Sequence, residues 1–517
     1  MDRTTTLSSL SEDPFDLIVV GGGITGAGVF RLAAQRGLRC LLIEQRDFAW
    51  GTSSRSGKLV HGGLRYIAQL QFKTSFHSVA EREKLLDAYP GLVNPLEMMV
   101  APPGASHFMK FGLGSLLAIY DWMSGTHRRK RYDRDTFLSL LPGWLNADIG
   151  GFSFVDGTTD DARLVMRVLQ EGRSAGGTAV NYVAAKGLMR SAEGQVEGVI
   201  AEDSETGKTY EIRARAVVSA TGAWADELRT SMGHAPRIRK LRGSHLIFSP
   251  ERLPLQRAAG LISPVDKRNM YVLPWEGRIL LGTTDLDHEH DLSDEPVIAP
   301  SERDYLLTTI NHWFPEAKLD QSDVLATMAG VRPVVGTGKA DPSKESREEI
   351  VWADNGLITI SGGKLTTFAL MARRALDAAE RWTGAGSRGA PTATEVEPLP
   401  ELSDPELMTR LLGRHGCAAA AVLAEAGGGE LERIADTPFL WAELRHAARH
   451  EQVVHLEDLL LRRVRIGLLL PNGGAGLFDR IREEARALGW DDARWDEETT
   501  RYTQLWSRAY GPNAGRG

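Results

Sequence analysis

The first strong hydrophobic pattern of the chain is an apolar run at residues 15–20, followed by a glycine turn and a helical pattern that reaches about Arg36. A second apolar run then ends at Glu44. Two short apolar runs separated by a stretch of helical length are typical of two parallel strands joined by a helix. The start of the chain therefore predicts an α/β unit.

The turn after the first predicted strand carries glycines in the spacing G-x-G-x-x-G. Gly21 allows a sharp turn, Gly23 lets the backbone approach a pyrophosphate, and Gly26 lets the helix lie close to the sheet. The phosphates are expected at the positive N-terminal end of that helix. Glu44 stands where a carboxylate accepts hydrogen bonds from ribose hydroxyls and repels the 2′-phosphate of NADP. These features predict a bound dinucleotide, which is either FAD or NAD.

A polar, glycine-containing stretch follows Glu44 and runs to about residue 71. Its hydroxyl groups, cations and glycines suit a segment that wraps a phosphate chain and delivers side chains to a flat ring, whereas a solvated surface loop is the alternative. Together with the first helical turn, this part of the chain is expected to supply the cofactor-binding residues Ile24, Thr25, Gln45, Thr52, Ser53, Ser54, Lys58, Leu59, His61, Gly62 and Gly63.

Two later segments are expected to return to the first sheet. Residues 179–220 have the pattern of a β-meander with hairpin turns at 193–194 and 206–207, and they end in a buried strand. Residues 357–361 predict another strand, followed by a glycine turn and a helix over 365–382. A plain NAD domain does not need this second strand–glycine–helix unit, but a long cofactor lying across the sheet does. The cofactor-binding residues expected here are Val183, Ala220, Thr221, Gly222, Gly362, Gly363, Lys364, Leu365 and Thr366.

The remaining patterns divide the chain into further domains. Residues 237–324 are rich in strand patterns and predict a second, mostly antiparallel sheet, and the chain beyond the linker-like stretch at 383–403 is helical. The expected fold class is therefore α/β with three parts. These are a Rossmann-like FAD-binding domain (14–90, 150–235 and 325–395), an antiparallel-sheet substrate domain (91–149 and 236–324) and a C-terminal all-helical domain (396–517).

Composition excludes several classes of protein. With 517 residues, 42% hydrophobic and 25% charged, the chain has the composition of a globular protein of two or three domains. The net charge of −7 gives no general attraction to nucleic acid, so no nucleic-acid partner is expected. Cys40 and Cys417 lie far apart and suit a reducing compartment. Residues 1–14 have no apolar core of a secretory signal, and no run of 18 apolar residues occurs, so we expect a cytoplasmic protein.

One segment leaves room for contact with a membrane surface. Residues 107–131 contain an apolar, aromatic stretch followed by the basic run 128–131. This order fits an interfacial helix whose basic flank binds anionic headgroups, and it fits equally a buried helix followed by a solvated charged loop.

A histidine pair in the C-terminal helical region is the one candidate for a metal site. His446 and His450 have the i, i+4 spacing of zinc ligands on a helix, but no third ligand is evident. A solvated helix face is the favoured interpretation, and no metal is expected.

Taken together, these motifs resemble those of a known family, the FAD-dependent glycerol-3-phosphate dehydrogenases within the D-amino-acid-oxidase-like flavoprotein group. The resemblance runs from about residue 14 to about 510, in the expected order. The segments that carry it are DLIVVGGGITGAG (16–28), TSSRSGKLVHGGLRY (52–66), DDARLV (160–165), RGSH (242–245), LGTTD (281–285), AGVRPVV (329–335), SGGKLTTF (361–368) and HLEDLLLRRVRIGL (455–468).

The resemblance implies FAD as cofactor, sn-glycerol 3-phosphate as electron donor, dihydroxyacetone phosphate as product and membrane quinone as acceptor. It implies peripheral association with the inner face of the cytoplasmic membrane and is compatible with a homodimer. Three alternatives stay open: a soluble glycerol-3-phosphate oxidase that uses oxygen, an amine or amino-acid oxidase on the same fold, and a non-catalytic dinucleotide sensor.

Flavin-dependent oxidation of a secondary alcohol needs a base for the hydroxyl proton and cations for the phosphate and the reduced flavin. His245 is the candidate base, with a structural histidine as the alternative. By the resemblance, Arg332 and Arg65 are the first candidates for the phosphate; Arg332 could instead hold the developing alkoxide, and Lys364 adds charge at the flavin or the substrate. The further substrate-binding candidates, carried by the resemblance, are Tyr66, Thr284, Asp285 and Arg347.

Overall fold

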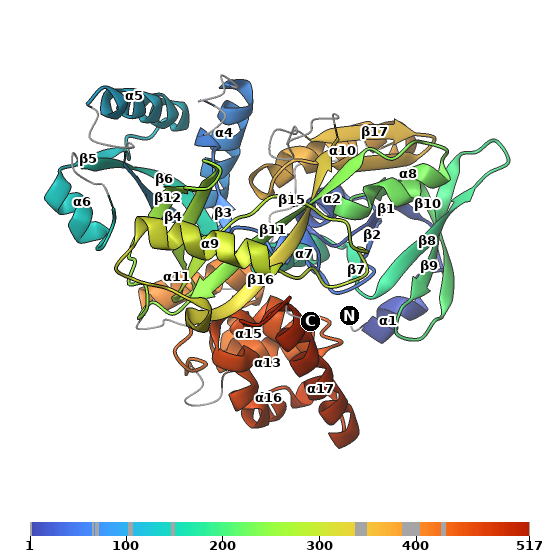
Figure 1. Ribbon diagram of the computed structural model, residues 1–517. Helices are drawn as coiled ribbons and strands as arrows, with labels where there is room; N and C mark the ends of the chain where they lie inside the picture. Colours follow the sequence, from blue (N-terminus) through green and yellow to red (C-terminus); the bar gives the residue numbers. More distant parts are fainter. Residues whose placement is uncertain are drawn as a thin grey trace.

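The computed structural model shows two β-sheets and a C-terminal group of helices (Figure 1). The structure describes residues 3–64, 67, 72–101, 107–145, 150–336, 349–384, 404–424, 426 and 431–515, with the side chains of 72–74 and 107–109 excepted.

The first sheet has a parallel centre in the order β18-β10-β1-β2-β7, with β17 antiparallel at its edge. Alternate residues of β1 divide between two apolar clusters. Leu17 and Val19 pack with helices α2, α7 and α10, whereas Ile18 and Val20 pack on the other side of the sheet. This burial on both faces is why the parallel strands are continuous apolar runs. The elements are α1 (Arg3–Ser8), β1 (Phe15–Val20), α2 (Ile24–Gln35), β2 (Cys40–Ile43), α7 (Asp161–Ser174), β7 (Thr178–Val180), β8 (Val183–Arg190), β9 (Val196–Asp203), β10 (Thr209–Ser219), α8 (Ala225–Ser231), β17 (Ile350–Asp354), β18 (Leu357–Ser361) and α10 (Phe368–Thr383).

The elements expected for this sheet are confirmed. Strands occupy 15–20 and 357–361, the second strand ends one residue before Glu44, and α2 ends one residue before Arg36. The meander is also present, because β8, β9 and β10 pair antiparallel across the two predicted hairpin turns. A short 3₁₀ turn at Leu365–Thr367 precedes α10, so the α-helix itself begins three residues later than expected.

The second sheet is mostly antiparallel, with its path in the order β15-β11-β14-β13-β12-β4-β6-β3 and with β16 paired to β11 and β5 to β6. The helix α9 packs on its core, and α4 and α5 stand together at its far end (Figure 1). The elements are β3 (Leu59–Val60), α4 (Phe72–Ala88), β4 (Val93–Val100), α5 (His107–Ser124), β5 (Lys130–Tyr132), α6 (Arg134–Leu140), β6 (Gly151–Thr159), β11 (Ile238–Phe248), β12 (Ala258–Ile262), β13 (Asn269–Trp275), β14 (Arg278–Gly282), β15 (Leu286–Asp287), α9 (Pro300–Trp313) and β16 (Val324–Val335).

Sheet membership does not follow the expected domain ranges everywhere. The strands β3, β6 and β16 lie largely within the ranges assigned to the FAD-binding domain, yet they pair in the second sheet. The strand β16 runs antiparallel along the whole of β11, from Ile238 opposite Val335 to Phe248 opposite Val324. A strand pattern predicts that a segment pairs but does not identify its partner, so the assignment to a sheet was not available from the sequence.

The C-terminal helices share their apolar core with the second sheet. Trp275 and Met328 of that sheet pack in one cluster with Trp441, Leu460 and Tyr502. The helices are α11 (Pro405–His415), α12 (Ala419–Ala424), α13 (Trp441–His450), α14 (Leu456–Asp458), α15 (Ile466–Leu469), α16 (Phe478–Glu484) and α17 (Asp492–Ala509), with a π-helical turn at Leu459–Arg463. Within the described ranges, none of the helices has both the length and the apolar character needed to cross a bilayer.

Candidate active site

A cleft of about 350 Å³ follows the carboxyl edge of the first sheet and extends to the second. This edge is where open α/β sheets bind their ligands, because the loops after parallel strands gather there. Many of the expected residues line it, namely Gly21, Gly23, Ile24, Thr25, Glu44, Gln45, Thr52, Ser53, Leu59, His61, Ala220, Thr221, Gly222, Arg332, Gly362, Gly363, Lys364, Leu365 and Thr366.

The first glycine turn is as tight as its sequence predicts. A Cβ on Gly21, whose φ is +111°, would lie 2.6 Å from the carbonyl oxygen of Ala220. A Cβ on Gly26 would lie 1.8 Å from the carbonyl oxygen of Gly21. The helix α2 starts directly after this turn, and the backbone N–H of Ile24 donates to Ser53 Oγ at 2.9 Å. Gly23, Ile24 and Thr25 line the cleft, so the positive N-terminal end of α2 lies where it can bind an anion.

Glu44 holds its carboxylate beside this turn. One oxygen accepts from the Gly22 N–H at 2.6 Å and the other from the Arg46 N–H at 2.9 Å. Burial raises the pKa of Glu44, although these two N–H groups favour its charged form. The carboxylate lines the cleft at the end of β2, which is the position from which an acid binds ribose hydroxyls.

The second glycine turn lies at the end of β18. Both Gly362 (φ +77°) and Gly363 (φ +69°) have left-handed backbone conformations, and a Cβ on Gly363 would lie 2.4 Å from Met371 Sδ. Lys364 follows and leads into the 3₁₀ turn and α10, and its ammonium group lies 3.3 Å from Ser78 Oγ. The N-terminal end of a second helix therefore reaches the same cleft.

The two helices that start at these turns are in direct contact. A Cβ on Gly28 of α2 would lie 2.7 Å from the ring of Phe368, the first residue of α10. Close packing of α2 and α10 brings both helix N-termini to one side of the sheet.

Arg332 enters the cleft from β16. Its guanidinium is held by Thr283 Oγ1 at 3.0 Å and by a carboxylate oxygen of Asp285 at 3.3 Å, and Arg268 contacts the other oxygen of Asp285 at 3.3 Å. Asp285 is buried, so it orients Arg332 from behind and does not line the cleft. A guanidinium fixed in this way suits an anionic ligand.

Three glycines of the second sheet make room for site residues. A Cβ on Gly243 would lie 2.7 Å from the Arg332 guanidinium, one on Gly282 would lie 2.1 Å from the His245 ring, and one on Gly330 would lie 2.8 Å from Arg55. These glycines belong to the segments RGSH, LGTTD and AGVRP, and the strands that carry them are adjacent. Their lack of side chains lets three large polar groups lie across the sheet.

His245 lies immediately behind the cleft. It is 1% exposed, and its Nε2 is 3.5 Å from the position of a Cβ on Gly57, which lines the cleft. Burial, followed by the charges of Arg332 and Lys58, holds the pKa of His245 well below its ordinary value. The imidazole is therefore neutral at physiological pH, the state that accepts a proton.

Several expected residues lie away from the cleft lining. The Lys58 ammonium group is fully buried and bonds to Asp161 at 2.7 Å, and burial, with the charge of Arg465, lowers the pKa of Lys58 to about 7. Thr284 donates to Glu302 at 2.6 Å behind the site. The others that do not line the cleft are Gly26, Ser54, Gly62, Gly63, Val183, His245 and Asp285. Arg65, Tyr66 and Arg347 lie outside the described residues.

The structure adds residues to the cleft that the sequence patterns did not single out. Trp50 and Trp224 lie with their ring centroids 6.0 Å apart, and the Arg46 guanidinium lies 4.2 Å above the Trp50 ring. Other lining residues that were missed are Gly51, Arg55, Ala223, Tyr271, Thr283, Gly330, Pro333 and Val334, whereas Ser56 and Gly57 belong to the polar stretch expected to wrap the cofactor. Most of them are neighbours of predicted residues, so position within a motif was the only available signal.

The two histidines of the C-terminal helix α13 differ in their exposure to solvent. His446 is buried beside His415 and Glu451, while His450 is exposed, so the interpretation of both histidines as solvated was wrong for His446. Both carboxylate oxygens of Glu451 already accept hydrogen bonds from Arg163, at 2.7 and 2.9 Å.

The donors that line the cleft fit FAD. Backbone N–H groups at the start of α2 suit the pyrophosphate, Glu44 suits the ribose, and the Gly362–Lys364 turn suits the polar edge of a flavin. The glycine contacts described above leave no space for side chains where the backbone must approach the cofactor.

Comparison with known proteins agrees with this fit. The model of the FAD dependent oxidoreductase family matches residues 16–378, and that of the C-terminal domain of alpha-glycerophosphate oxidase matches residues 360–495. An aerobic glycerol-3-phosphate dehydrogenase of Bacillus subtilis is 36% identical over 387 residues, which are 73% of this chain and 69% of its own. Glycerol-3-phosphate dehydrogenase 2 of Mycobacterium tuberculosis is 34% identical over 530 residues, which cover 97% of this chain and 89% of its own.

Solved structures show the same relationship. The glycerol-3-phosphate dehydrogenase from Bacillus halodurans complexed with FAD has a TM-score of 0.75 and 27% identity, and the match covers 97% of this chain and 95% of its own. The L-alpha-glycerophosphate oxidase from Mycoplasma pneumoniae shares the fold, with a TM-score of 0.57, 16% identity and coverage of 71% of this chain and 95% of its own. FAD is therefore the cofactor. The chain belongs to the FAD-dependent oxidoreductase family, in its glycerol-3-phosphate dehydrogenase branch, and is a flavoprotein oxidoreductase.

Proposed function

We propose that this protein oxidises sn-glycerol 3-phosphate to dihydroxyacetone phosphate and that the electrons pass to membrane quinone. The observation that carries the proposal is Arg332, which Asp285 and Thr283 hold at the cleft in a position suited to an anion. The near-full-length relatives named as glycerol-3-phosphate dehydrogenases support this choice of substrate. Assembly as a homodimer stays a prediction.

The oxidation removes a hydride from C2 and a proton from its hydroxyl group. FAD, when bound, supplies the two-electron acceptor for the hydride. His245 takes the hydroxyl proton, since its neutral imidazole lies just behind the cleft wall formed by Gly57. Arg332 binds the phosphate or the developing alkoxide. Lys364 adds positive charge just before the N-terminal end of α10. Arg65, Tyr66 and Arg347 are the further residues proposed for the substrate pocket, whereas Thr284 bonds to Glu302 behind it.

Contact with a membrane is supported by one face of α5. Phe111 is 76% exposed and Trp122 is 74% exposed, and their spacing of eleven residues places them on the same side of the helix. Ile119 of α5 is also exposed, and so is Phe76 of the adjacent helix α4. The basic run 128–131 begins just beyond the end of α5. The expectation of a fully buried helix does not fit these exposures, whereas exposed aromatic groups beside basic ones suit an anionic lipid surface.

The first test uses the absorption of the bound flavin. Anaerobic addition of glycerol 3-phosphate to the purified holoenzyme should bleach the yellow colour, because the two-electron acceptor becomes reduced. A soluble quinone analogue should then restore the colour much faster than oxygen does. Rapid recolouring by air with formation of peroxide would instead identify an oxidase, and bleaching only by an amine or amino acid would reject the proposed substrate.

Substitution of Arg332 tests the phosphate site. Arg332→Ala should raise KM for glycerol 3-phosphate by about 100-fold, because the bound anion loses a fixed guanidinium partner. Arg332→Lys should recover only part of that loss, since lysine lacks the planar fork. Steady-state kinetics of both variants provide the measurement, with Arg252→Ala as control, because Arg252 pairs with Asp323 at an exposed site. An unchanged KM for glycerol 3-phosphate in Arg332→Ala would show that Arg332 does not bind the substrate phosphate.

Substitution of His245 tests the base. His245→Asn should lower kcat by about 10²- to 10⁴-fold. Because the pKa of His245 is lowered, the imidazole stays neutral until the pH falls well below 6.5, so the acidic decline of kcat/KM in the wild type should lie below that value. The pH profile of kcat/KM is the measurement, and His312→Asn, a change at an exposed position of α9, is the control. A decline centred at or above pH 6.5 would argue against His245 as the base.

Flotation with vesicles tests the membrane contact. The wild type should float with vesicles that contain anionic phospholipid, and the double variant Phe111→Ser, Trp122→Ser should bind about tenfold less because it loses two apolar anchors. Val265→Ser is a matched control, since Val265 is 64% exposed in the loop between β12 and β13. If the wild type stays at the bottom of the gradient, α5 is not a lipid contact.

A further inference from the structure

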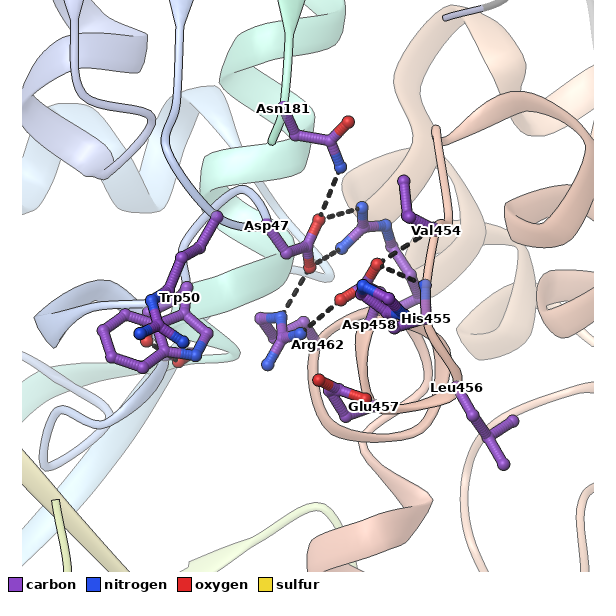
Figure 2. A network of polar contacts seen from close by, with 12 residues as sticks. Asp47, Trp50, Asn181, Val454, His455, Leu456, Glu457, Asp458 and Arg462 are labelled. Carbon is purple, nitrogen blue, oxygen red and sulfur yellow. Dashed lines mark hydrogen bonds and ion pairs between the residues drawn. The ribbon is translucent and has the colours of Figure 1, made fainter. Parts of the chain in front are cut away.

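The cofactor loop, defined as residues 45–58, is held from behind by the C-terminal helices. At its centre is Asp47, which is fully buried. Its carboxylate accepts from Arg462 Nε at 2.5 Å and from both terminal nitrogens of Arg463 at 2.7 and 2.8 Å. Asn181 adds a fourth bond at 3.1 Å. Figure 2 shows Asp47 between Asn181 on one side and the C-terminal segment that carries Asp458 and Arg462 on the other.

Two further contacts fix the same loop from the same direction. Arg465 donates to the carbonyl oxygen of Ser54 at 2.8 Å. Tyr510, which follows α17, accepts hydrogen bonds from Arg55 Nε at 3.3 Å and from a terminal nitrogen of Arg55 at 3.0 Å, and it bonds to Glu295. The backbone and a side chain of the loop are therefore both bound by residues from the last part of the chain.

The opposite side of the loop forms the wall of the FAD cleft. Trp50, Thr52, Ser53 and Arg55 all line it. Ser53 Oγ accepts the N–H of Ile24 at 2.9 Å, at the first turn of α2, the helix whose N-terminus would hold the pyrophosphate. Thr52 also donates to the carbonyl oxygen of Val331 at 2.5 Å, one residue before Arg332. Any displacement of the loop would therefore move groups at the FAD site.

The charge of Asp47 explains why the loop depends on this support. Burying a carboxylate without partners is costly, and the loop contributes no cation to Asp47, because its own Arg46 stacks on Trp50. Burial alone would raise the pKa of Asp47, but the charges of Arg463 and Arg462 lower it. If these arginines were absent, the carboxylate would be driven toward water and the loop would move with it.

We propose that the C-terminal helical region holds the cofactor loop in its FAD-binding conformation, with Asp47 as the central positioning residue. FAD affinity then depends on Arg462, Arg463 and Tyr510, which lie behind the loop on the side away from the cleft.

The test measures the dissociation constant of FAD for full-length apoprotein by quenching of FAD fluorescence, well below the unfolding temperature. Asp47→Asn keeps the volume but removes the charge, and it should raise the dissociation constant about tenfold or more. Tyr510→Phe removes only one hydroxyl group and should raise it about threefold. The visible circular dichroism of the bound flavin should change in both variants, because the cleft wall moves.

The matched control is Glu276→Gln. Glu276 bonds to Arg410 at 2.8 Å and thus joins the same C-terminal region to the second sheet, far along the chain from the cofactor loop. The dissociation constant of FAD for the Glu276→Gln variant should stay within about twofold of the wild-type value. The proposal is overturned if Glu276→Gln weakens FAD binding as much as Asp47→Asn, or if folded Asp47→Asn and Tyr510→Phe both bind FAD normally. Should Asp47→Asn fail to fold, the outcome for Tyr510→Phe decides.

Discussion

The parallel pairing of three strands is the constraint on which the rest of the site depends. Val20 at the end of β1 lies opposite Ser219 of β10, and Ser219 lies opposite Thr359 of β18, so the three strands end together at one edge. Each is followed by a glycine-containing turn that lines the cleft. Because hydrogen-bonded register fixes these ends, two helix N-termini reach one elongated ligand although they are far apart in the chain.

The second sheet places the polar side chains of the site, and it does so in a different way. Its glycines leave room for polar side chains of neighbouring strands. The Arg332 guanidinium lies over Gly243, and His245 packs against Gly282, its partner across the two strands. His245 is thereby placed in a buried position, where burial and the charges of Arg332 and Lys58 lower its pKa, whereas Arg332 stays partly exposed at the cleft. The first sheet therefore positions the cofactor, and the second controls the electrostatic environment beside it.

Hydrophobic runs and glycine spacing were sufficient to predict the parallel strands β1, β2, β10 and β18, both glycine turns and the position of Glu44 at the end of the second strand. These features are local, because a strand pattern and a turn residue carry their own physical reason. The direction in which an individual side chain points depends instead on tertiary partners that the local sequence does not reveal. Lys58 lies between predicted cofactor residues, yet its ammonium group turns away to Asp161. Trp50 and Trp224 line the cleft, but an isolated tryptophan gives no signal until tertiary packing brings it there. The sheet to which β16 belongs and the burial of His446 likewise depend on distant partners.

The separation between Asp47 and its arginines has a consequence for biosynthesis. Asp47 and Arg462 are 415 positions apart, so the ribosome delivers the cofactor loop long before the cations that neutralise it. Until these cations are synthesised, the aspartate of the loop has no charge partner. In the same way, α2 lacks the helix against which it packs until α10 is synthesised. Contacts of such long sequence separation form slowly and leave apolar strand edges exposed in the meantime. The network around Asp47 therefore cannot form before Arg462 and Arg463 have been synthesised, 415 and 416 positions after it.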